Sequence, residues 1–388
     1  MIENDGATMP SGPRDARPPG ETPPPRSPKS RRPWLRKPLH WVWVAIRSLL
    51  QFLLIAWAAL ALNFSNLPWP WLRLLLAVAF AALGAWAFWF RPYTRTPETR
   101  RRIRWGVAAA FLAVFIWYIC IPPSHDRHWR ADVAVLPRAT IDGDGDHVHL
   151  TGFRNFDYRT RDDVTVRWEE RDFSLAHVVS LDFFISYWHP GPVAHTFVSF
   201  NFDDGTPPLC ISIECRPEVG EGFAPIASMF KQFELIYVVG DERDVIGVRA
   251  AHRDEMVFLY PIRTTPDAAR RLLRIYLDRT NALADHPEWY HLLKSNCSLN
   301  IVRYANAAGR HGDFDIRHFL NGWSDRYLYE AGWVDTSIPF DELRRRANIT
   351  AVARENINAP DFSKRIRQPA PSVDRQSTNA SPNEPVHP

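Results

Sequence analysis

Cysteine is scarce in this 388-residue chain, which contains only four: Cys120, Cys210, Cys215 and Cys297. None lies in a CxxC pair or at the spacing of metal ligands, so the sequence offers neither a disulfide framework nor a metal site. Cys210 and Cys215 lie an odd number of residues apart in one expected strand and should face opposite sides of it, which argues against a bond between them. We recognise no cofactor-binding motif and expect no cofactor.

The sequence also lacks a nucleic-acid-binding motif, and its net charge of +4 comes mainly from two basic segments near the N-terminus. A cleavable signal peptide is not expected, because the first apolar run begins near residue 40 and is longer than the apolar core of such a peptide. We therefore exclude nucleic acid as a partner and expect the first apolar run to remain as a membrane anchor.

Charged residues are absent from three long runs, residues 48–67, 74–90 and 105–121. A 17-residue helix is about 26 Å long, close to the ~30 Å hydrocarbon core of a bilayer. Tryptophans accompany these runs, as they do at membrane interfaces: Trp69, Trp71, Trp86, Trp89, Trp105 and Trp117. Buried helices of a soluble core are the alternative, but the clustering of three such runs favours a membrane domain of three transmembrane helices over residues 40–122.

The distribution of arginine and lysine predicts the orientation of these helices. Residues 1–39 contain eight Lys or Arg and ten prolines, which indicates a disordered, basic arm. The expected loop 91–104 contains six arginines, whereas the connection 63–70 contains none. Because basic loops stay in the cytoplasm, we expect a cytoplasmic N-terminus in the inner membrane of a bacterium, with everything after residue 122 in the periplasm.

Residues 123–366 have the composition of one globular domain, followed by a disordered tail over 367–388. Strands are expected at 147–153, 163–169, 178–187, 194–201, 210–215 and 234–240. A helix is expected after Thr265, which has the character of an N-cap and is followed by proline. Strands followed by helices indicate an α+β fold. We interpret the charge run 241–244 as a solvated loop and the aspartates at 142, 144 and 146 as a polar turn.

Two residues of this domain have the character of a thiol nucleophile and its base. Cys297 precedes an apolar pattern typical of a helix, and a helix N-terminus lowers the pKa of a thiol and offers N–H groups to an oxyanion. His195 lies in an alternating strand, where it is held as a rigid base. The alternatives are a small buried cysteine and a half-buried histidine, both common in cores.

A third residue should orient the histidine, and we select Glu214 on the next expected strand, because opposing side chains of adjacent strands lie about 5 Å apart. Ser199 and Ser212 compete for this role, and an ordinary ion pair of Glu214 with Arg216 or Arg243 is the alternative. His291, six residues before the cysteine, is a rival base.

Several segments of the domain resemble the Lnb N-terminal periplasmic domain family over residues 128–365. They are RNFDY at 154–158, AHTFVSF at 194–200, SIECR at 212–216, YVVGDERD at 237–244 and SNCS at 295–298. The resemblance implies a circularly permuted papain-like fold with Cys297 as nucleophile and His195 as base. It also implies kinship with a lipoprotein N-acyltransferase, in which the membrane helices follow the periplasmic domain rather than precede it.

The sequence therefore predicts three transmembrane helices followed by a permuted papain-like periplasmic domain. Its expected activity is that of a cysteine acyltransferase that forms a thioester and passes an acyl chain to a lipoprotein amine or a similar acceptor. Membrane lipid and a lipoprotein are the expected partners. The alternatives are a papain-like cell-wall amidase or peptidase and a non-catalytic, membrane-anchored binding module. Both enzymatic hypotheses require an accessible thiol of low pKa.

Overall fold

The computed structural model describes residues 36–65, 67–90, 96–310, 312 and 314–370. Most of the predicted arm, 1–39, and of the predicted tail, 367–388, lies outside the described residues; residues 36–39 are described and begin helix α1. The chain separates into two compact units, Met1–Leu53 and Leu54–Pro388. The first contains the beginning of helix α1, and the second contains the remaining spans together with the globular domain.

Three helices are long and apolar enough to cross a membrane, at His40–Asn63, Pro70–Trp89 and Pro97–Cys120. They belong to α1 (Arg36–Asn63), to α2 (Pro70–Ala85) with the π-helical turn η1 (Trp86–Phe90), and to α3 (Pro97–Cys120). The three predicted spans are thus confirmed as candidates, but the expected loop 91–104 is too long. Thr96 caps α3, so four of the six loop arginines lie in the first turns of that helix.

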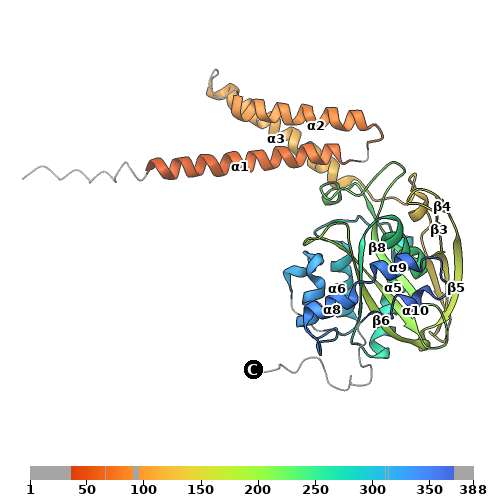
Figure 1. Ribbon diagram of the computed structural model, residues 1–388. Helices are drawn as coiled ribbons and strands as arrows, with labels where there is room; N and C mark the ends of the chain where they lie inside the picture. Colours follow the sequence, from red (N-terminus) through yellow and green to blue (C-terminus); the bar gives the residue numbers. More distant parts are fainter. Residues whose placement is uncertain (1–35, 66, 91–95, 311, 313, 371–388) are drawn as a thin grey trace, which may run out of the picture. The chain divides into compact units, whose positions relative to one another are not determined.

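A sheet forms the centre of the globular domain (Figure 1). It has eight strands in the order β1-β2-β9-β8-β7-β6-β10, with β5 paired to β2. Its strands are β1 (Arg138–Ile141), β2 (His147–Arg154), β5 (Trp168–Ser174), β6 (Val178–Tyr187), β7 (His195–Phe202), β8 (Leu209–Arg216), β9 (Glu234–Gly240) and β10 (Met256–Pro261). Pairing is antiparallel except between β2 and β9.

The strand predicted at 163–169 is wrong, because that segment divides between two sheets. Its first residues form β4 (Val164–Thr165), which pairs with β3 (Asp157–Tyr158) in a separate ribbon. Its last residues open β5, which pairs with β2. The other five predicted strands are present with shifts of at most one residue at either end.

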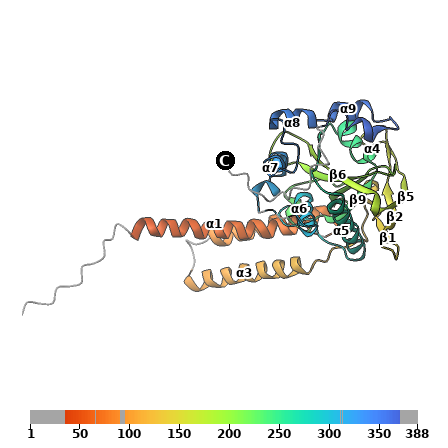
Figure 2. The ribbon, with the colours of Figure 1, turned by 90° about the horizontal axis from the view of Figure 1, so that it is seen from below.

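Helices cover both faces of the sheet (Figure 2). On one face, α5 (Pro266–Asp285) and α6 (Cys297–Ala307) pack on a core that includes Val198, Phe200 and Ile211. On the other, α4 (Glu242–Val245), α9 (Thr350–Glu355) and α10 (Phe362–Arg365) pack on Phe197, Cys210 and other side chains of opposite parity. Two short helices, α7 (Ser324–Glu330) and α8 (Phe340–Ala347), complete the α+β domain. The alternation of side chains along the central strands β6 to β9 therefore supplies two cores rather than one core and one wet face.

The charge run at 241–244 is not a solvated loop, so that interpretation was wrong. Asp241 caps α4, and the side chains of Glu242 and Asp244 are fully buried. Asp244 accepts two hydrogen bonds from Arg154 and one from the Phe156 N–H, whereas Glu242 pairs with Arg367. Buried carboxylates require such partners, and here the partners come from distant parts of the sequence.

Candidate active site

Cys297 is the first residue of helix α6, as the sequence predicted. The helix begins there because the Asn296 side chain accepts a hydrogen bond from the Leu299 N–H at 2.8 Å, which satisfies one of the free donors at the helix start. The Asn296 amide also donates to the Leu292 carbonyl at 2.6 Å. The Asn296 side chain therefore holds both the segment before Cys297 and the first turn of α6. The Cys297 sulfur lies at the positive end of the helix.

His195 is the first residue of β7, and its side chain hydrogen-bonds to the Cys297 thiol. The neighbouring Thr196 points to the opposite face, where its hydroxyl lies 2.7 Å from that of Ser298 at the start of α6. Strand β7 thus contacts the helix through Thr196 and presents the imidazole through the residue before it, His195. The site lies where the end of the strand meets the start of the helix.

Two side chains of β8 continue this chain of contacts away from the sulfur. His195 Nε2 lies 2.7 Å from Ser212 Oγ, and Ser212 Oγ donates to Glu214 Oε1 at 2.7 Å. Because the single hydroxyl proton of Ser212 goes to the carboxylate, Ser212 accepts the hydrogen bond from the imidazole, and Nε2 carries a proton. Nδ1 is then the nitrogen that remains to accept the thiol proton.

Glu214 was predicted to contact the histidine directly, but its oxygen lies 3.8 Å from His195 Nε2 and acts through Ser212. Ser212 and Glu214 therefore both contribute, with the Ser212 hydroxyl lying between the imidazole and the carboxylate. Ser199, the other competitor, donates instead to Glu242 at 2.5 Å. Glu214 is not paired with Arg216 or Arg243 either, because its cationic partner is Arg249.

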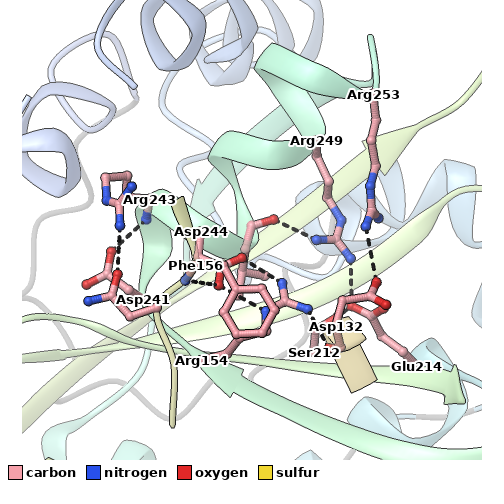
Figure 3. A network of polar contacts seen from close by, with 12 residues as sticks. Asp132, Arg154, Phe156, Ser212, Glu214, Asp241, Arg243, Asp244, Arg249 and Arg253 are labelled. Carbon is pink, nitrogen blue, oxygen red and sulfur yellow. Dashed lines mark hydrogen bonds and ion pairs between the residues drawn. The ribbon is translucent and has the colours of Figure 1, made fainter. Parts of the chain in front are cut away.

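Arg249 anchors the far end of this series and was not foreseen from the sequence. It projects from the π-helical segment η5 (Val248–His252) and donates to Glu214 Oε1 at 2.7 Å and to the Val245 carbonyl at 2.6 Å. Figure 3 shows Arg249 of this segment reaching to Glu214, and Arg253, the residue after the segment, reaching to Asp132, beside the Arg154–Asp244 pair. A buried arginine of this kind holds the carboxylate in place and ionised.

The electrostatics of the site favour a thiolate. Burial raises the pKa of the Cys297 thiol, but the charge and hydrogen bond of His195, together with the hydrogen bonds of Thr196, outweigh it and lower the pKa to about 6. Burial likewise raises the pKa of Glu214, and Arg249 with His195 holds it well below its usual range. At neutral pH the thiol is ionised, and the His195 ring that accepts its proton is backed on the far side by a carboxylate.

The thiol is nevertheless buried, with only 4% of the residue exposed, so the expectation of an accessible sulfur was wrong. Tyr290 and Tyr304 belong to the same buried cluster, on the face of the sheet that α6 covers. A bulky molecule could contact this thiol only if the surrounding side chains moved. The low pKa distinguishes this cysteine from the half-buried Cys215, whose thiol pKa is raised to about 12 by desolvation.

Asn321 is the other residue that sequence reasoning missed. Its amide Nδ2 donates to Cys297 Sγ at 3.6 Å, and its Oδ1 accepts from the Ala194 N–H at 2.8 Å. That second bond fixes which atom of the amide faces the sulfur. A donor held beside the nucleophile is the type of group that stabilises an oxyanion. Its position in a short 3₁₀ turn, 24 residues after the cysteine, gave no local signal.

His291, the rival base, is engaged elsewhere. Its Nδ1 accepts from the Leu293 N–H at 3.1 Å, and its backbone pairs with Ser295 in an isolated bridge. Within the described ranges, no group of three or more His, Cys, Asp or Glu side chains has the arrangement of a metal site. The four cysteines, all of them described, are free thiols.

Residues 165–322 match the family model of the Lnb N-terminal periplasmic domain. The chain therefore carries a domain of this family, which confirms the resemblance over a narrower range than 128–365. The match includes all five residues of the candidate site, which are Cys297, His195, Ser212, Glu214 and Asn321. Comparison with curated proteins and with solved structures gives no match. With the three apolar helices, the Lnb N-terminal periplasmic domain makes this a membrane-anchored protein with a periplasmic domain.

Proposed function

We propose that this protein is a cysteine acyltransferase of the bacterial inner membrane, with a cytoplasmic N-terminus and a permuted papain-like domain in the periplasm. Cys297 is its nucleophile, His195 its base, and Ser212 with Glu214 orients the base. Asn321 and the N–H groups at the start of α6 hold the oxyanion. The acyl donor is a membrane lipid ester, and the acceptor is a lipoprotein amine or a similar amine.

In the first half-reaction, the Cys297 thiolate attacks the carbonyl carbon of the ester. A carbon–sulfur bond forms, and the tetrahedral oxyanion lies near the Asn321 amide. As the carbon–oxygen bond breaks, the imidazolium of His195 donates its proton to the departing alkoxide. The products are a thioester on Cys297 and a free alcohol, with His195 neutral.

In the second half-reaction, the neutral amine of the acceptor attacks the thioester. A carbon–nitrogen bond forms, the carbon–sulfur bond breaks, and His195 takes the proton lost by the amine. The thiolate and imidazolium are restored, and the acyl chain leaves as an amide. Because only 4% of Cys297 is exposed, the thioester is protected from water, which would otherwise release a fatty acid.

The observation that carries this proposal is the unbroken series of contacts from the buried thiol through His195 and Ser212 to Glu214. A structural cysteine requires only a space to fill, whereas this cysteine has an imidazole, a donor amide and a pKa lowered to about 6. Such a combination of burial with specific charged partners is typical of a catalytic group.

The test uses the full-length protein in liposomes that contain a phospholipid with a labelled acyl chain. We expect the label to attach to Cys297 as a thioester that neutral hydroxylamine cleaves, and to move to a diacylglyceryl-cysteine peptide with a free amine. Cys297→Ser should abolish both steps, whereas the matched control Cys215→Ser should retain them, because Cys215 lies on β8 outside the series.

The other outcomes separate the alternatives. Release of free fatty acid with no amide would identify a lipid hydrolase and refute the transfer step. Acylation by cell-wall peptides in place of lipids would identify an amidase or peptidase. A Cys297 that forms no adduct with either donor, and that small thiol reagents modify only after denaturation, would leave a binding module.

A further inference from the structure

Large apolar side chains are exposed on the loops that lead into the candidate active site. They are Trp188, Phe223, Ile226, Met229 and Leu293, with between 40% and 56% of each residue exposed. We call this set the apolar rim. Trp188 lies seven residues before His195, and Leu293 lies four residues before Cys297. The remaining members belong to the long connection between strands β8 and β9.

Direct contacts join these loops into one surface. The rings of Trp188 and Phe223 stack with their centroids 5.8 Å apart and an interplanar angle of 19°. The Leu292 N–H donates to the Ser228 carbonyl at 3.0 Å, which ties the segment before Cys297 to the β8–β9 connection. The rim is therefore a continuous feature beside the site rather than a scatter of single exposed residues, which would carry no meaning.

The same β8–β9 connection is attached to the ends of two candidate spans. Phe230 contacts Phe64, just after α1, and Tyr118, near the end of α3, with ring centroids 5.9 and 6.3 Å apart. Lys231 Nζ donates to the carbonyls of Ile119 and Ile121 at 3.0 and 2.7 Å. Ile119 lies in the last turn of α3, and Ile121 is the first residue after it.

The covalent chain gives a second and independent restraint. Only three residues separate Cys120 at the end of α3 from Ser124, whose N–H donates to the buried Glu234 carboxylate at 3.1 Å. Four residue steps span at most about 14 Å, so the first residue of β9 lies close to the membrane boundary. The connection that precedes β9 therefore runs at the level where spans α1 and α3 leave the hydrocarbon.

We propose that the apolar rim lies in the interfacial layer of the bilayer and that its occupant is membrane lipid. Aromatic and large aliphatic side chains fit this layer, because their rings and chains lie among the upper acyl groups. The proposed membrane contact of the rim rests on the contacts of Phe230, Lys231 and Ser124 described above. The further step, that lipid reaches Cys297 across the rim, rests on the proposed acyl-transfer function.

The first experiment places the photo-crosslinking residue p-benzoylphenylalanine at Ile226 or Phe223 in the full-length protein, reconstituted in vesicles of phosphatidylethanolamine and phosphatidylglycerol. We expect irradiation to add the mass of a phospholipid at both positions. The control position is Val166, which is 46% exposed, is outside the rim and lies between β4 and β5, where no lipid adduct is expected. Absence of the adduct at Ile226, equal adducts at Val166, or crosslinks to a second protein chain alone would overturn the proposal.

A second experiment separates the rim from the chemistry by comparing Ile226→Asp with Val166→Asp. A charge placed at the rim should cause a loss of acyl transfer from vesicle lipid but leave the reaction of Cys297 with a small soluble thiol reagent unchanged, and Val166→Asp should change neither. Lipid adducts at Ile226 without any thioester would refute the proposed function and leave the rim in place. Thioester formation that Ile226→Asp does not reduce would refute the route across the rim.

Discussion

Removal of the Ser212 hydroxyl tests the series of contacts that defines the site. The change Ser212→Ala leaves the His195 Nε2 proton without an acceptor, because the nearest oxygen of Glu214 is 3.8 Å away. The imidazolium then loses a hydrogen bond at 2.7 Å, and the thiolate of Cys297 loses part of the charge that stabilises it. The pKa of Cys297 should therefore rise from about 6.

The size of this rise follows from the geometry. An imidazolium and a carboxylate 3.8 Å apart attract by roughly 4 kcal/mol at an effective dielectric constant of about 20. Arg249 offsets much of that attraction, and Ser212→Ala leaves the carboxylate in place. The loss is then the hydrogen bond to a charged group, about 1.5–3 kcal/mol. This corresponds to a rise of roughly one to two pKa units, at about 1.4 kcal/mol per unit.

The assay is the rate of Cys297 alkylation by iodoacetamide as a function of pH, with the labelled residue identified by mass spectrometry. In the unmodified protein the rate should reach half its maximum near pH 6, since the thiolate is the reactive form. In Ser212→Ala this midpoint should move to higher pH. The matched control is Ser199→Ala, since Ser199 is a buried serine of the same sheet that donates to Glu242 instead. A midpoint unchanged by Ser212→Ala, or moved equally by the control, would refute the reasoning.

Three further predictions concern other parts of the domain. Asn321→Ala should slow acylation of Cys297 by about 10²- to 10³-fold, which is the effect of losing an oxyanion donor. The pH midpoint of Cys297 alkylation should move less than it does in Ser212→Ala. A midpoint shift as large as that of Ser212→Ala would contradict the assigned role. Asp244→Ala should lower the free energy of unfolding by about 3–5 kcal/mol in thermal unfolding, because it leaves the buried guanidinium of Arg154 without its carboxylate partner. The control Asp163→Ala removes an exposed ion pair and should have little effect. Bulky maleimides should modify Cys297 far more slowly than iodoacetamide does, given its 4% exposure, and equal rates would show that the sulfur is open.

Strands were predictable where the local alternation of side chains decides the structure. The prediction failed where the choice of partner strand decides it. The segments of β6 and β9 were delimited to the residue from their runs of apolar side chains. Residues 163–169 alternate equally well, but Val164 pairs with Tyr158 in a ribbon, while Trp168 pairs with Arg154 in the main sheet. A sequence window contains no information about which partner strand lies nearby. The edge strand β10 was missed altogether.

The candidate site divides in the same way. Cys297 and His195 were predictable because each has a local signal, a helix start and a strand of alternating residues. Ser212 and Glu214 were both considered, but their order in the series depends on the register of β8 against β7 and on how far each side chain reaches. Arg249 comes from a π-helical turn 35 residues beyond Glu214, and no local pattern predicted its role. The charge run 241–244 was misread for the same reason, because the arginines that neutralise it are distant in sequence.

The burial of Cys297 and its lowered pKa are compatible only because the charges around it are arranged in advance. A thiolate in an apolar cluster is costly, and the pKa of Cys215 shows the usual result, a rise to about 12. At Cys297 the imidazole, backed by Ser212 and Glu214, reverses that result. In the proposed acyl transfer, the thiol is thus ionised before any substrate arrives, and the step that remains is entry of the carbonyl. In an enzyme of this design, control over the reaction belongs to the loops beside the site, and these are the loops that carry the apolar rim.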